Sequence, residues 1–240
     1  MANTAKVNIN KPTVSAANTD VPIRGSKYGE QLQVPLSDSR QALADEGSYY
    51  VVSNQTPGTG LATTATASAV LDVSPYFMLL NNDAAGGKNV YLDYLKLICT
   101  VSGAAATSVR YTVKVDNGVG RYTSGSSLTA LPQNVNMNSS GVTVCLAYAG
   151  PLVAAAATAA VRVLGSGAFR TGVPVIGDTY ILNFGTPGIG VGSGVATINN
   201  VIFNHPPVII GPQQTFLLHL WLPAQSVASN YEIEVGWWER

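Results

Sequence analysis

Residues 215–240 read TFLLHLWLPAQSVASNYEIEVGWWER and hold two strand-like runs, 215–222 and 231–238. In the second run, apolar residues at odd positions alternate with Glu232 and Glu234 at even positions. This period of two is typical of a strand with one buried face. All three tryptophans of the protein lie in these two runs, so its largest apolar side chains belong to the closing strands. The segment predicts half-buried antiparallel strands.

The composition predicts one domain, or one domain with an arm, whose surface carries few charges. The chain has 240 residues, of which 46% are hydrophobic and only 11% are charged, and its formal net charge is zero. A soluble domain usually has about 25% charged residues. A lone monomer usually keeps net charge for solubility. The surface is therefore rich in uncharged polar residues, or other subunits cover it, and we weigh the second explanation heavily.

Targeting signals and reactive cysteines are not visible in the chain. The N-terminus has no apolar segment that would act as a signal peptide, and no run approaches the roughly 18 apolar residues of a membrane span. We therefore expect synthesis in a cytoplasm, no classical export and no membrane partner. Cys99 and Cys145 are isolated in sequence. They could pair across two strands, but buried free thiols are the favoured interpretation.

Residues 1–47 predict an extended arm with a short helix over 37–47, and residues 48–240 predict the folded domain. The arm is interrupted by prolines and slightly basic, with Lys6 and Lys11 among its few charges. A nucleic-acid-binding arm would carry a dense Lys/Arg block, and this one does not, so no direct nucleic-acid contact is expected. The arm is expected to lie on a neighbouring subunit or to be flexible.

After residue 48, the pattern is one of short strands and turns with almost no helix. Residues 151–164 are ambiguous, because their alanines favour a helix while the flanking Gly and Pro favour a loop and then a strand. About ten strands with no crossover helices predict an all-β fold, an antiparallel β-sandwich of the jelly-roll type. The expected strands are 49–53, 70–80, 90–101, 109–115, 142–148, 160–164, 173–176, 179–184, 195–203, 215–222 and 231–238.

No motif for a known reaction is recognisable. The two histidines, His205 and His219, have no companion ligands at zinc-site spacing, and His219 is interpreted as a core histidine. The glycine-rich residues 185–194 lack the G-K-[ST] ending of a phosphate loop, so a loop between strands is favoured. No catalytic, cofactor-binding or metal-binding residue is assigned, and no cofactor is expected.

The closing strand supplies the candidate interface residues. Glu232 and Glu234 lie on one face, roughly 6.5–7 Å apart. Such a pair can serve a glycosidase or bind calcium, but the polar face of a strand is the stronger interpretation. A Lys or Arg from a neighbouring strand or subunit is the expected partner. Trp237 and Trp238 must face opposite ways, so one is core and the other is an interface anchor or a sugar-stacking platform.

Residues 208–222, VIIGPQQTFLLHLWL, resemble a recurring element of viral jelly-roll proteins. In such proteins an apolar run is followed by a proline-containing turn and a long apolar strand. Over roughly residues 50–240, the layout is similar to virion structural proteins of tailed bacteriophages, particularly head decoration or cement proteins. The resemblance implies a symmetric oligomer, with a trimer favoured, that binds the major capsid protein on the outer shell.

The leading hypothesis is therefore a non-enzymatic virion protein on the capsid surface, which cements the shell by bridging its subunits. The interface residues expected to take part are Trp237, Trp238, Glu232 and Glu234, with Lys6 and Lys11 of the arm. The alternative is a phage tail or spike component, or a lectin-like module that recognises a glycan or receptor. A hydrolase that uses Glu232 and Glu234 is the least favoured hypothesis.

Overall fold

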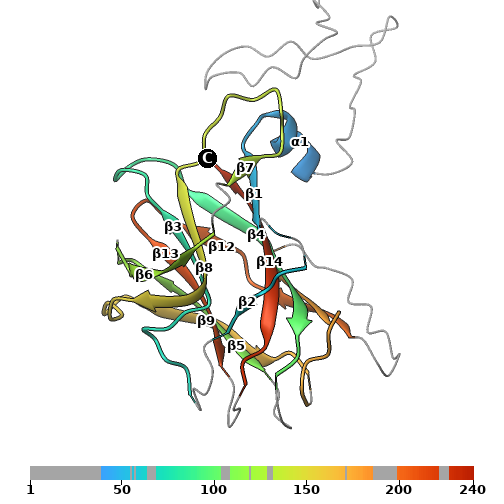
Figure 1. Cartoon of the computed structure of the whole chain (residues 1–240). Helices are drawn as coiled ribbons and strands as arrows, with labels where there is room; N and C mark the ends of the chain where they lie inside the picture. Colours follow the sequence, from blue (N-terminus) through green and yellow to red (C-terminus); the bar gives the residue numbers. More distant parts are fainter. Residues whose placement is uncertain are drawn as a thin grey trace, which may run out of the picture. The chain divides into compact units, whose positions relative to one another are not determined.

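The structure is a computed structural model, and its largest unit is a sandwich of two β-sheets (Figure 1). It describes residues 39–54, 56, 58–63, 69–103, 109–118, 120–128, 132–170, 172–185, 199–221 and 227–240. The chain divides into two compact units, Met1–Ala42 and Leu43–Arg240. Lys6 and Lys11, and the arm to which they belong, lie outside the described residues. The short helix is confirmed as α1, Ser39–Asp45.

The larger sheet has eight strands, six of them in the order β11-β10-β4-β14-β1-β7, while β12 pairs with β4 and β2 pairs with β14. Its centre is the pair of β4 and β14, the two longest strands of this sheet, and this pair confirms the prediction that the closing run forms a strand. The bounds are β1 Tyr49–Ser53, β2 Leu61–Ala62, β4 Val90–Val101, β7 Gln133–Asn134, β10 Thr179–Phe184, β11 Asn200–His205, β12 Val208–Ile210 and β14 Asn230–Glu239.

The smaller sheet has six strands in the order β6-β8-β3-β13-β5-β9. Its centre is β13, whose residues are nearly all buried, as expected for a strand covered on both faces. The bounds are β3 Phe77–Asn81, β5 Arg110–Asp116, β6 Tyr122–Ser127, β8 Cys145–Ala154, β9 Arg162–Ala168 and β13 Thr215–Trp221.

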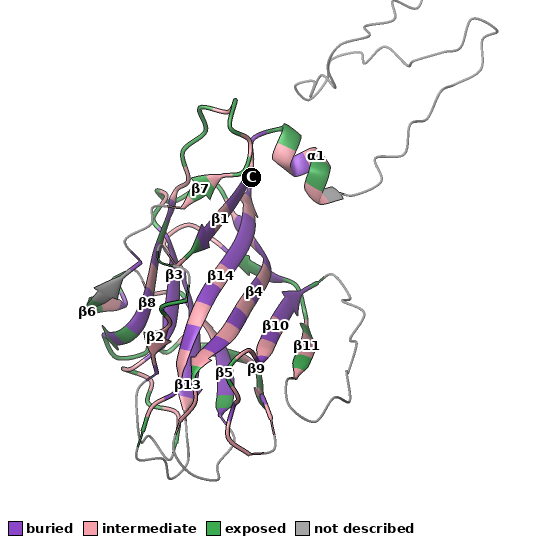
Figure 2. Ribbon diagram, turned by 45° about the vertical axis from the view of Figure 1, so that its right-hand side comes forward, coloured by how far each residue is buried: buried purple, intermediate pink, exposed green. Residues whose placement is uncertain are grey.

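The inner faces of the two sheets share one apolar core. Alternate residues of β4 and β14 are buried on this side, and Figure 2 shows the resulting bands of buried and partly exposed residues along β14. The predicted all-β sandwich is confirmed. One pairing differs from the antiparallel prediction, because β10 and β11 run parallel. A two-residue hairpin cannot join parallel neighbours, and residues 185–199 lie between these two strands in the chain.

A second apolar cluster in the smaller sheet forms where the end of β8 packs against β3 and β13. Gly150 has φ of 103°, a conformation that favours glycine, and it lies between residues 145–149, which pair with β3, and residues 152–154, which pair with β6, while Tyr148 pairs with both strands. Residues 152–154 cover Met78 and Leu217, which are fully buried in this cluster. This resolves the ambiguous residues 151–164: they form the end of β8, a loop and the start of β9, with no helix.

Three details of the strand prediction are wrong. Residues 173–176 form no strand, so Gly177 and Asp178 do not close a hairpin. The turn signal at residues 116–118 does not join neighbouring strands either, because β5 lies between β13 and β9. Asp116 of this segment instead accepts hydrogen bonds from Gly118 N and from groups that are distant in sequence. Of residues 70–80, only the end forms β3, after Pro75.

Both cysteines are free and buried, which confirms the favoured interpretation. Burial raises the pKa of the Cys99 thiol to about 11 and that of Cys145 well above its usual value. A thiol with a raised pKa holds little thiolate at neutral pH, so these groups contribute apolar packing rather than nucleophiles.

Candidate functional site

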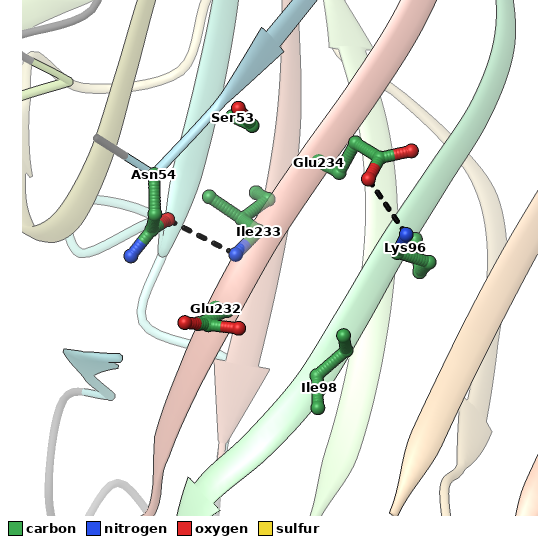
Figure 3. Close-up of a pocket in the computed structure, with 7 residues that line it drawn as sticks. All are labelled: Ser53, Asn54, Lys96, Ile98, Glu232, Ile233 and Glu234. Atoms are coloured by element: carbon green, nitrogen blue, oxygen red, sulfur yellow. Dashed lines mark hydrogen bonds and ion pairs between the residues drawn. The ribbon is translucent and has the colours of Figure 1, made fainter. Parts of the chain in front are cut away.

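The outer face of the larger sheet carries three of the predicted interface residues, Glu232, Glu234 and Trp238. Glu232 and Glu234 of β14 point away from the core, between strands β1 and β4 (Figure 3). They line a shallow pocket of about 190 Å³ together with Ser53, Asn54, Lys96 and Ile98. The prediction that the two glutamates lie on the polar face of an alternating strand is therefore confirmed.

The cationic partner expected for this pair is Lys96 of β4. Its Nζ lies 2.6 Å from Glu234 Oε2, and the Tyr94 hydroxyl donates to Glu234 Oε1 at 2.6 Å. Partial burial alone would raise the pKa of Glu234, but these hydrogen bonds and the Lys96 charge outweigh it, so the pKa is lowered. Glu232 accepts a hydrogen bond from Gly58 N.

The surroundings of Glu234 do not suit a glycosidase acid or a calcium ligand. A glycosidase acid needs a raised pKa, whereas Glu234 is held as a carboxylate. A calcium site would need several carboxylate and carbonyl oxygens around one point, where here the Lys96 ammonium lies. Within the described ranges, no three His, Cys, Asp or Glu side chains gather as metal ligands would.

The two adjacent tryptophans face opposite ways, as the sequence predicts. Trp237 is fully buried in the core, where it stacks on Tyr50 with ring centroids 6.3 Å apart. Trp238 is partly exposed on the outer face, and its ring lies parallel to that of Tyr91 at 5.5 Å. Of the two, Trp238 is thus the one on the outer face, and Trp237, which was also a candidate interface residue, belongs to the core.

Trp238 is part of a row of apolar side chains that crosses the larger sheet. Tyr91 of β4 is paired with Trp238 on one side and with Ile209 of β12 on the other. Tyr49 of β1 is paired with Trp238, and Val135 N donates to Tyr49 O. Directly paired residues share a face of a sheet, so these five residues form a continuous line on the outer face. We call Ile209, Tyr91, Trp238, Tyr49 and Val135 the apolar row.

The apolar row is partly exposed and rigidly supported. Ile209 is 53% exposed and Val135 is 42% exposed, while Tyr49 is buried and its hydroxyl donates to Asp93 Oδ2 at 2.6 Å. Close to Tyr49, Gly236 leaves room for this hydroxyl, since a methyl group there would lie 2.6 Å from it. The sheet therefore presents a preformed apolar line about 19 Å long, given the usual spacing between strands.

The loop after β7 also carries exposed apolar side chains. Met137 is 93% exposed and Val142 is 80% exposed, the two highest values among the large apolar residues that the structure describes. The side-chain oxygens of Asn134 and Asn136 accept hydrogen bonds from the backbone N–H groups two residues later. These bonds stabilise the conformation of the loop. This loop was not predicted, although its alternating asparagines at 134, 136 and 138 were a visible signal.

A second cluster of polar side chains lies on the smaller sheet, where its buried ion pairs and hydrogen bonds hold the fold together. Arg121 is 2% exposed and donates to the carboxylates of Asp116 and Asp72, and Lys114 Nζ lies 2.8 Å from Asp72 Oδ1. His219 Nε2 lies 3.3 Å from the backbone oxygen of Asp72. Burial lowers the pKa of His219 to about 4, and the charges of Lys114 and Arg121 act in the same direction. The prediction that His219 is a core residue is confirmed.

His219 makes the stability of the fold dependent on pH. Between about pH 6.5, the ordinary pKa of an unfolded histidine, and about pH 4, the unfolded chain binds a proton that the folded chain does not. Acidification through this window therefore favours unfolding, by at most about 1.4 kcal/mol per pH unit from this group. We expect urea midpoints that fall from pH 7 to pH 4.5, and a smaller fall in His219→Gln.

The carboxylates near His219 do not cause the loss of stability on acidification through this window. Burial would raise the pKa values of Asp72 and Asp116, but hydrogen bonds from Lys114, Thr158 and Arg121 outweigh it and lower both. They stay charged throughout the window, and their contribution is lost only below it. The pKa of His205 is also lowered by burial, so His205→Gln is the matched comparison. If the urea midpoint changed equally with pH in the wild type and in both variants, the assignment of the pH dependence to His219 would be contradicted.

Comparison of the chain with family models, curated proteins and solved structures found no match. The described part of the chain contains no helix with the length and hydropathy needed to span a bilayer.

Proposed function

We propose that this protein is a non-enzymatic structural subunit of a tailed-phage virion, which binds the outer capsid shell and bridges its major capsid subunits as a symmetric oligomer. The observation that carries this proposal is the apolar row. It is a line of apolar side chains on the outer face of the larger sheet, in which Ile209, Trp238 and Val135 are at least partly exposed. A jelly-roll topology and a trimer belong to the same proposal, on the strength of the sequence resemblance.

The distribution of charge supports docking rather than turnover. The chain has few charged residues, and several of them are already paired within the sheets, including Glu234 with Lys96 and Asp178 with Arg170. Burying a surface without free charges avoids most of the desolvation cost that opposes association. Each contact between the chain and a shell can be modest, because many copies bind the same particle.

The lectin-like alternative uses the same residue in a different way. A sugar would stack on an exposed ring face of Trp238. One face of this ring already stacks on Tyr91, the flanking Ile209 is aliphatic, and the hydroxyl of the flanking Tyr49 is already engaged with Asp93. An apolar protein contact fits such surroundings better than a glycan, whose hydroxyl groups need polar partners.

The test is binding of purified chain to shells that lack it. Trp238→Lys and Ile209→Lys each place a charge in the apolar row, at side chains that are partly exposed, and we expect each to weaken binding at least tenfold. Val163→Lys is the matched control, because Val163 is 63% exposed on β9 of the other sheet. Co-sedimentation with shells measures the affinities.

Two results would contradict the proposal. Equal binding of wild type, Trp238→Lys and Val163→Lys would show that the apolar row is not the contact surface. Specific binding on a glycan array that Trp238→Ala abolishes, with no binding to shells, would favour the lectin-like alternative.

A further inference from the structure

Among the described strands, β11 is the last of the larger sheet. It follows β10 in the sheet order, and no described strand lies on its other side (Figure 2). Asn199 O and His205 O accept hydrogen bonds from the β10 side, from Thr179 N and Gly185 N. Because backbone groups alternate along a strand, Ile202 turns its N–H and C=O away from β10.

The edge at β11 lacks the features that usually prevent pairing between sheets. Edge strands are commonly very short, bulged, charged or interrupted by proline. The other described edges have such features: β7 has two residues, β6 has two register shifts, and β9 has a register shift and an exposed Arg162. By contrast, β11 has six uncharged residues, NVIFNH, and a continuous register with β10.

The core beneath β11 is incompletely covered. The inward residues of β10, Tyr180, Leu182 and Phe184, are almost completely buried. Their neighbours on β11, Val201 and Phe203, pack against the same core but are only partly buried. One more strand beyond β11 would bury these two side chains, so the edge offers apolar area as well as backbone hydrogen bonds.

We propose that β11 pairs antiparallel with β11 of a second copy of this chain, about a two-fold axis through Ile202. The sequence of the strand is complementary to itself in this register. Ile202 lies opposite Ile202, each Asn200 lies opposite Asn204, and each Val201 lies opposite Phe203. The two Ile202 residues exchange both N–H···O=C bonds, and no like charges meet.

This contact deepens the proposed function, on which it rests, by naming one interface of the symmetric oligomer. It gives a dimer, and in an assembly of trimers it would join neighbouring trimers. The contact lies at the edge of the sheet, whereas the apolar row lies on its face. The following experiments use purified chain without shells, so their failure leaves the shell-binding test of the proposed function unaffected.

The first experiment is sedimentation velocity of the full chain and two variants. Ile202→Lys brings two like charges together at the two-fold axis and is expected to halve the particle mass. Ile181→Lys is the matched control, because Ile181 is paired with Ile202 on the same face but lies on the interior strand β10. We expect an even number of copies for wild type and for Ile181→Lys. A wild-type monomer or trimer, or an intact dimer of Ile202→Lys, would overturn the proposal.

The second experiment fixes the register by disulfide cross-linking. In the proposed pair, the Cα atoms of residue 202 lie about 5.5 Å apart, within disulfide range, so Ile202→Cys is expected to form a covalent dimer on mild oxidation. The two copies of residue 200 lie about 13 Å apart along the strand, so Asn200→Cys should not cross-link. The native thiols are both buried, which keeps the background low. Cross-linking of Asn200→Cys but not Ile202→Cys would overturn the register.

Discussion

Replacement of Trp237 by alanine is expected to lower the free energy of unfolding by about 3–5 kcal/mol, the range measured for large buried aromatic residues. Trp237 has no exposed surface, stacks on Tyr50 and donates from Nε1 to Glu239 Oε1 at 3.2 Å. Its removal leaves a cavity between the sheets and takes one donor from a buried carboxylate. Urea unfolding at neutral pH measures the difference.

Trp238→Ala is the matched control, one residue further along the same strand. Trp238 is partly exposed, and its main contact is the parallel stack on Tyr91. An aromatic pair of this kind contributes about 0.5–1.5 kcal/mol, so the control should cost about 1 kcal/mol. A larger loss for Trp238→Ala than for Trp237→Ala would mean that β14 presents its opposite face to the core.

Replacement of Arg121 by methionine is the second change with a large expected effect, again about 3–5 kcal/mol. Arg121 is buried and donates to Asp116 and Asp72, and Asp116 has no exposed surface. Methionine keeps much of the side-chain volume but removes the charge, so it leaves the buried Asp116 carboxylate without its cation, whereas Asp72 keeps Lys114. In a domain of about this size, such a loss lowers the melting temperature by roughly 2–4 °C per kcal/mol.

Arg240→Met is the control for charge removal in general. Its ion pair with Glu46 spans 3.4 Å, and the Arg240 side chain is 62% exposed, so screening by water makes the pair worth little. Arg121→Lys keeps a positive charge near Asp116 and should fall between wild type and Arg121→Met. Equal stability losses in Arg121→Met and Arg240→Met would show that the buried cluster does not stabilise the fold.

Much of the fold could be predicted because single strands leave a local signal. The alternation in residues 231–238 identified β14, its buried face and the opposite directions of Trp237 and Trp238. The low helix content and the frequent turns indicated a sandwich. These properties depend on neighbouring residues in sequence, which is why periodicity reports them.

The arrangement of the strands could not be predicted, because it depends on pairing between distant segments. Nothing local in residues 179–205 indicates that β10 and β11 run parallel. Likewise, the alanines after Gly150 carry no sign that β8 would bend over Met78 and Leu217. Alanine has a high helix propensity, but pairing with β6 and burial against this cluster override it.

The candidate site was predicted only in part for the same reason. Glu232, Glu234 and Trp238 are visible in one strand, and the need for a cation beside the glutamates follows from their spacing. That Lys96 is this cation, and that Tyr91 and Ile209 continue the line from Trp238, requires the register of β4 with β14 and β12. Lys6 and Lys11 lie outside the described residues and stay a prediction.

Whether this chain binds the outer capsid shell, as we propose, is tested by titrating shells that lack it with purified wild-type chain. We predict saturable binding that ends at a fixed whole-number ratio of chain to major capsid subunits, because symmetric contacts repeat over the particle. No co-sedimentation with shells, or binding that rises without saturation, would contradict it.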